Sequence, residues 1–166
     1  MNSLLQLHRL VSRAMRTALP ASAVTTAVAA ICGRRDDGEP IAPVNAISHI
    51  VWGDTAAEQD DASIQYTAVG TVLNTMAVTS WSLVYEVFFG KLARKGNVAT
   101  AVLGGVAVAG LAYVTDYHVV PKRLTPGFEK RLSPTSMLLV YSALAVSLPL
   151  VSLLEGHATS KGRRNQ

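Results

Sequence analysis

Two short stretches of this 166-residue chain carry side chains suited to acid–base or metal chemistry. Their candidate residues are His49, Trp52, Asp54, Asp116, Tyr117 and His118. Two imidazoles and two carboxylates can together hold a divalent metal ion or a titrating proton. A structural role is the simpler hypothesis, in which Asp116 pairs with Lys122 or Arg123 and His49 anchors its own segment. We favour that role and predict neither a bound metal nor any other cofactor.

Two further polar residues, Asn74 and Glu86, lie in or beside a long apolar stretch. An ionisable group at the centre of a membrane costs at least about 2.5 kcal/mol, so such groups are candidates for function. We expect Glu86 near the cytoplasmic interface, where it would pair with Lys91 or Arg94. Asn74 is predicted deeper, where an amide usually hydrogen-bonds to a neighbouring helix. Because Glu86 and Asp116 are predicted on opposite sides of the bilayer, they cannot form a carboxylate dyad.

The chain lacks the short motifs that mark common enzyme classes. It contains no GxSxG, HExxH, P-loop, GxGxxG or CxxC sequence, so hydrolase, zinc-protease, nucleotide and thiol-redox chemistry have no support. Its single cysteine, Cys32, also excludes a disulfide framework. We therefore predict no catalytic residue and a protein that is not an enzyme.

The distribution of charge indicates which elements hold these residues. Only 16% of the chain is charged and 49% is hydrophobic, whereas soluble proteins carry about 25% charged residues. Asp, Glu, Lys and Arg leave four long gaps, at residues 17–33, 62–85, 96–115 and 136–154. Since a helix needs roughly 20 mostly apolar residues to cross a bilayer, the gaps predict an all-α polytopic membrane protein.

We predict one transmembrane domain, residues 17–154, preceded by a basic amphipathic flank at 1–16 and followed by a tail at 155–166. Its four transmembrane helices are expected at about 17–33, 66–89, 97–118 and 136–154. The first loop, 34–65, contains a helical pattern at about 43–52 that is too short to span. This pattern predicts an interfacial or re-entrant helix with Trp52 at headgroup depth. Ser133 before Pro134 favours the start of the fourth helix at that point.

Basic residues indicate the orientation of these helices. With the N-terminus in the cytoplasm, nine Lys and Arg residues fall on the inner side and six on the outer side. That bias predicts both termini in the cytoplasm. It also accounts for the net charge of +4 without a nucleic-acid partner. One alternative stays open, because the basic N-terminus, the apolar stretch and the sequence Ala27-Val28-Ala29 also fit a secretory signal peptide; we favour a retained helix.

Small residues predict how the helices pack. Ala101, Gly105 and Ala109 recur every four residues on the third predicted span, a spacing that lets two helix backbones approach closely. We expect Gly105→Leu to destabilise the bundle and Gly105→Ala to be mild. Four short helices enclose little volume, so transport would require an oligomer. The expected partners are the lipid bilayer and either further copies of the chain or another membrane protein.

Three stretches resemble small bacterial inner-membrane proteins of unknown function, of the YagU-like kind. They are residues 42–53, the pair Tyr85-Glu86 and residues 116–127. The resemblance implies a location in the bacterial inner membrane and supplies no reaction. We accordingly predict a non-enzymatic polytopic protein that is accessory to an envelope complex. The alternative is a small transporter or channel subunit, coupled to protons or metal ions, that uses the polar residues named above as an oligomer.

Overall fold

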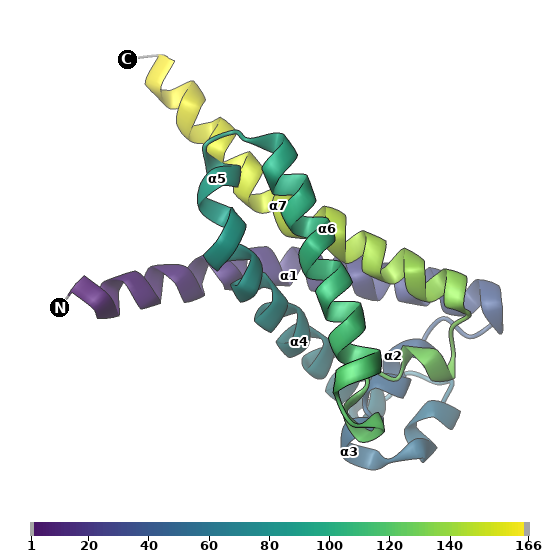
Figure 1. The fold of residues 1–166 in the computed structure, drawn as a ribbon. Helices are drawn as coiled ribbons and strands as arrows, with labels where there is room; N and C mark the ends of the chain where they lie inside the picture. The colour runs from purple at the N-terminus through teal and green to yellow at the C-terminus, as the bar shows by residue number, and fades with distance from the viewer. Residues whose placement is uncertain (1, 165–166) are drawn as a thin grey trace.

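The protein is all-α, as the charge pattern predicts. Its computed structural model describes residues 2–164, with side chains described for residues 3–157, and no strand occurs among them. Four long helices form a bundle (Figure 1): α1 (Asn2–Asp36), α4 (Val69–Tyr85), α6 (Val98–Val114) and α7 (Pro134–Arg164). Within the described residues, three helical segments are long and apolar enough to cross a membrane, namely Ser3–Asp36, Val98–Val119 and Pro134–His157.

The predicted second span, 66–89, is helical but is not among these three segments. Two π-helical turns, η2 (Ile64–Ala68) and η3 (Glu86–Gly90), flank α4, and α5 (Lys91–Arg94) continues the same rod. The α4 helix itself is 17 residues long and contains several hydroxyl-bearing residues. Several of them donate to the carbonyl four residues earlier, at 2.7–3.1 Å: Thr71, Thr75, Thr79 and Ser80. Such bonds satisfy a hydroxyl within its own helix.

Helix α1 joins two segments that the sequence analysis separated. The predicted flank, 1–16, and the predicted span, 17–33, form one helix, and Pro20 lies inside it without ending it. The N-terminal part extends away from the bundle (Figure 1), and its Leu4 side chain is 73% exposed. Further along, Ala18 and Ala21 are fully buried, because α1 packs on both α4 and α7. The small side chains permit this close packing.

One end of the bundle is covered by a cap, which we define as residues 37–63 and 120–133. The first part contains α2 (Ala42–Ile47), α3 (His49–Trp52) and the 3-10 helix η1 (Asp54–Glu58). The second part contains the 3-10 helices η5 (Lys122–Leu124) and η6 (Phe128–Lys130). The helix predicted at 43–52 is thus present but divided at Ser48, and every residue of α2 is buried. Helix α2 is therefore packed into the protein instead of lying along its surface.

Basic side chains of the second cap part fasten the first. Arg123 donates to the backbone carbonyls of Ile50 and Val51, at 3.2 and 3.4 Å. Arg131 donates to the carbonyl of Ala57 at 2.9 Å and to the Asp60 carboxylate at 2.6 Å. These contacts connect segments that are more than 70 residues apart in the sequence. The cap is therefore a folded unit on the bundle end.

The start of α7 and its packing on α6 follow the sequence pattern. Ser133 precedes Pro134, and its Oγ accepts a hydrogen bond from the backbone N–H of Ser136 at 3.3 Å. On α6, Ala101 is fully buried and Ala109 is 3% exposed. A Cβ at Gly105 would collide with the backbone carbonyl oxygen of Ala145. Even Gly105→Ala therefore requires the two helices to separate, which corrects the expectation that it is mild.

Candidate functional site

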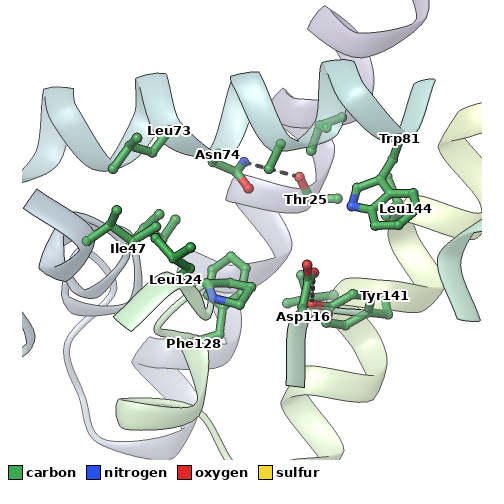
Figure 2. A pocket seen from close by; sticks show the side chains of 15 residues that line it. Thr25, Ile47, Leu73, Asn74, Trp81, Asp116, Leu124, Phe128, Tyr141 and Leu144 are labelled. Carbon is green, nitrogen blue, oxygen red and sulfur yellow. Dashed lines mark hydrogen bonds between the residues drawn. The ribbon is translucent and has the colours of Figure 1, made fainter. Parts of the chain in front are cut away.

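The central feature of the cap half of the bundle is a cavity of about 120 Å³. All four long helices or their extensions line it, together with α2, α3, η5 and η6 of the cap. The polar lining residues are Thr25, Asn74, Trp81, Asp116 and Tyr141, and the rest of the wall is apolar (Figure 2). Exposed Ala77 and Leu124 also belong to the wall, so the cavity opens to the surroundings between α4 and the cap.

Asp116 lies in the π-helical turn η4 (Thr115–Val119), which continues α6 toward the cap. Its Oδ2 accepts a hydrogen bond from the hydroxyl of Tyr141 on α7, at 2.7 Å (Figure 2). The expected pairing with Lys122 or Arg123 is wrong, because Arg123 is turned toward the carbonyls of α3. In the described part of the chain no basic side chain forms an ion pair with Asp116.

Asn74 enters the cavity from α4 and is 7% exposed. Its Nδ2 lies within hydrogen-bonding distance of three α1 hydroxyls, those of Ser22, Thr25 and Thr26, at 3.3, 3.5 and 3.1 Å. The Ser22 hydroxyl is also bonded to that of Thr75 at 2.9 Å. These contacts are the interhelical hydrogen bonds expected of a buried amide. The amide oxygen points into the cavity (Figure 2).

The other residues of the predicted polar cluster separate into two places. Tyr117 and His118 stay on η4 near Asp116, where the Tyr117 ring makes a tilted contact with Tyr113 and an edge contact with Tyr141, with centroid distances of 5.2 and 6.1 Å. The His118 side chain is exposed and contacts the Tyr113 ring at 5.9 Å. His49, Trp52 and Asp54 lie in the cap.

Each of the three cap residues makes a structural contact, although the buried Nε2 of His49 has no hydrogen-bond partner among the described residues. His49 is 2% exposed, and its Nδ1–H donates to the carbonyl of Ala46 at 2.9 Å. Trp52 donates to the Gln65 carbonyl at 2.9 Å, and Asp54 pairs with Lys130 at 2.7 Å. The hydrogen bond from Lys130 lowers the pKa of the Asp54 carboxyl. Across the described residues no three His, Cys, Asp or Glu side chains converge as metal ligands would.

A second polar cluster lies at the opposite end of the bundle, around Glu86. Glu86 is buried and its carboxylate accepts hydrogen bonds from Arg94 at 2.7 Å, Ser152 at 2.6 Å and Thr17 at 3.4 Å. A Cβ at Gly90 would collide with the Glu86 carboxylate, so this glycine makes room for it. The cluster connects α1, the α4–α5 rod and α7. Its geometry is that of a satisfied ion pair.

Sequence reasoning missed the partners that come from distant helices. It anticipated Arg94 as a partner of Glu86, since the two are close in the sequence, but not Ser152 or Tyr141. Serines and tyrosines occur throughout the spans, and neither has a local pattern that identifies its partner. The cavity itself was also missed, because its wall combines residues from eight elements.

No protein-family model, curated protein or solved structure matches this chain. The resemblance to the YagU-like proteins therefore stays a prediction.

Proposed function

We propose that the protein is a non-enzymatic, four-span protein of the bacterial inner membrane, accessory to an envelope complex, with both termini in the cytoplasm. The observation that carries this proposal is a four-helix bundle in which α1 packs on α4 and α7, and α6 packs on α7. Three of its helical segments are long and apolar enough to cross a membrane. Large apolar side chains cover the outside of α6 and α7, which suits contact with lipid. Examples, with exposed fractions between 52% and 70%, are Leu103, Val106, Leu111, Leu138 and Val146.

The environment of α4 supports a fourth span. Asn74 is its most polar residue at depth and faces hydroxyls of α1. Glu86 is neutralised by Arg94 at the end that carries the chain termini. Four hydroxyls of α4 donate within the helix, those of Thr71, Thr75, Thr79 and Ser80, whereas the buried Ser82 hydroxyl has no partner among the described residues. The contacts that are formed reduce the polar cost of placing α4 in a bilayer.

The packing of α1 supports a retained helix over a cleaved signal peptide. Ala29, which lies in the Ala27-Val28-Ala29 stretch, is fully buried and belongs to an apolar cluster with Ile47, Phe128 and Val140. Removing the chain up to Ala29 would also remove the hydroxyls that bind Asn74. We expect the mature protein to retain the α1 residues that precede Ala30. A mature N-terminus near Ala30, found by mass spectrometry, would contradict this part of the proposal.

Cysteine labelling tests the topology. Single cysteines replace Ser3, Asp60 or Ser160 in a Cys32→Ala background, and intact cells are treated with a membrane-impermeant maleimide. The cap residue Asp60 should label from outside, whereas the two terminal positions should label only after the membrane is permeabilised. Labelling of either terminus from the same side as Asp60 would refute the proposed arrangement.

A second candidate function is a small transporter or channel subunit, and the cavity between Asn74 and Asp116 favours it. Because this cavity is small and lies within a single bundle, a continuous pathway across the membrane requires several copies of the chain. Light scattering in mild detergent should then give a protein mass of two or more chains. A mass of one chain at every concentration would contradict the transporter function and leave only the accessory role.

A further inference from the structure

We propose that the cavity binds a small organic cation, a protonated amine with an apolar body of one ring or a short chain. The inference deepens the second candidate function, because the cavity would be the substrate site of that transporter. Binding itself depends neither on the topology nor on the oligomeric state. A failure of binding can therefore be distinguished from a failure of the transport proposal.

The charge of the ligand follows from the unbalanced carboxylate. Asp116 faces into the cavity and receives one hydrogen bond from the chain, that of Tyr141 at 2.7 Å (Figure 2). Among the described side chains, no lysine, arginine or histidine lines the cavity. A carboxylate in an apolar wall is stabilised when a cation pairs with it. The chain supplies none here, so a bound ligand would provide the positive charge.

The remaining polar atoms select a hydrogen-bond donor. The Asn74 amide oxygen points into the cavity and is reached by no hydrogen bond from the described residues (Figure 2). It and the Asp116 carboxylate together offer acceptors to an ammonium group, which carries donors only. Trp81 has the one side-chain N–H of the wall that lacks a partner among the described residues. A neutral alcohol could accept a hydrogen bond from that N–H, so an alcohol is the comparison ligand for the amine.

The size and the lining of the cavity determine the rest of the ligand. Trp81, Phe128 and Tyr141 provide aromatic faces, which attract organic cations. The other walls are aliphatic, as at Leu73 and Leu144. The volume is about 120 Å³, and a cavity of about 150 Å³ accommodates benzene. One five-membered ring with an amine therefore suits the space, whereas a lipid does not. A divalent metal is disfavoured because Asp116 is the only carboxylate that the described residues place in the wall.

Intrinsic fluorescence provides a local readout. The chain has two tryptophans, and a Trp52→Phe variant leaves Trp81 in the cavity wall as the only one, whose emission is excited at wavelengths that tyrosine does not absorb. This protein, purified in mild detergent at neutral pH, is titrated with cyclopentylamine and, separately, with cyclopentanol. The two probes have the same ring and nearly the same size but differ in charge. We expect cyclopentylamine to change Trp81 emission with an affinity at least about tenfold higher than that of cyclopentanol, because charged hydrogen bonds are the stronger ones.

Two variants test the role of the carboxylate. Asp116→Asn keeps an acceptor for Tyr141 but removes the charge, so the preference for the amine should disappear. Tyr141→Phe removes the hydroxyl that competes for Asp116, so the amine should bind as well as before or more tightly. Asp54→Asn is the matched control, since its side chain is 86% exposed and paired with Lys130 in the cap; the preference should persist.

Several results would overturn the proposal. They are equal affinities for the two probes in the Trp52→Phe protein, no response of Trp81 to either probe, and an amine preference that survives Asp116→Asn. If Asp116→Asn does not fold, the Tyr141→Phe protein decides the question: loss of amine binding in that folded variant contradicts a direct role of the free carboxylate.

Discussion

Replacing Arg94 by Gln is expected to lower the free energy of unfolding by about 3 kcal/mol, because it leaves a buried carboxylate without its cation. The Glu86 side chain is 1% exposed and that of Arg94 is 18% exposed, and their N–O distance is 2.7 Å. Removing one partner of such a buried pair typically costs about 3–5 kcal/mol. We take the lower value because Ser152 and Thr17 still donate to the carboxylate.

The double variant Glu86→Gln/Arg94→Gln separates the pair from its surroundings. If the cost of Arg94→Gln arises from the unpaired charge, removing that charge should restore more than half of the lost stability. Lys91→Gln is the matched control: it is an exposed cation next to the same cluster, and we expect a change within about 0.5 kcal/mol. Reversible unfolding in mixed detergent micelles, followed by far-ultraviolet circular dichroism, provides the measurement. A stable Arg94→Gln protein, or a double variant as unstable as the sum of the single ones, would refute this reasoning.

Three further predictions follow from particular contacts. Gly105→Ala should lower the melting temperature in detergent, since its Cβ meets the Ala145 carbonyl, whereas Gly110→Ala on the same helix has open space and should be neutral or stabilising; the reverse order would contradict the packing. Asn74→Leu should cost about 0.6–1.7 kcal/mol in the same unfolding assay through its lost bonds to α1, and no loss would show that those bonds are not formed. The pKa of Asp54 is lowered in the folded protein, so the contribution of its carboxylate to cap stability is complete above the ordinary value of 3.8 and is lost as the pH falls through the lower folded value. In Lys130→Ala, carboxyl NMR should show the pKa of Asp54 move toward 3.8. An unchanged pKa would exclude the Lys130 contact as the cause of the shift.

The sequence predicted the features that depend on local spacing. The charge-free gaps located the long helices because apolar length is a property of consecutive residues, and Ser133-Pro134 identified the start of α7 for the same reason. The four-residue repeat through Gly105 indicated a close helix contact, which the structure places against α7. Glu86 was expected beside Lys91 or Arg94, and Arg94 is its partner.

Features that depend on tertiary packing could not be predicted in this way. The cap buries α2 and turns Arg123 toward α3, so Asp116 pairs with Tyr141 instead of its sequence neighbours. The expected cluster of six polar residues therefore divides between the cap and the end of α6. Helix α1 continues through Pro20 because the helices packed around it stabilise it. The charge pattern alone predicts a boundary between a flank at 1–16 and a span at 17–33.

The position of α4 is the most direct test of the four-span proposal, since α4 is the one of the four long helices that is not among the candidate membrane spans of the described residues. Asp60 precedes the helical rod and Lys95 follows it. Single cysteines at these two positions, in a Cys32→Ala background, are treated with an impermeant maleimide in intact and in permeabilised cells. The four-span proposal predicts that the Asp60→Cys protein labels in intact cells and that the Lys95→Cys protein labels only after permeabilisation. Labelling of both positions in intact cells, or of neither, would show that α4 does not cross the membrane.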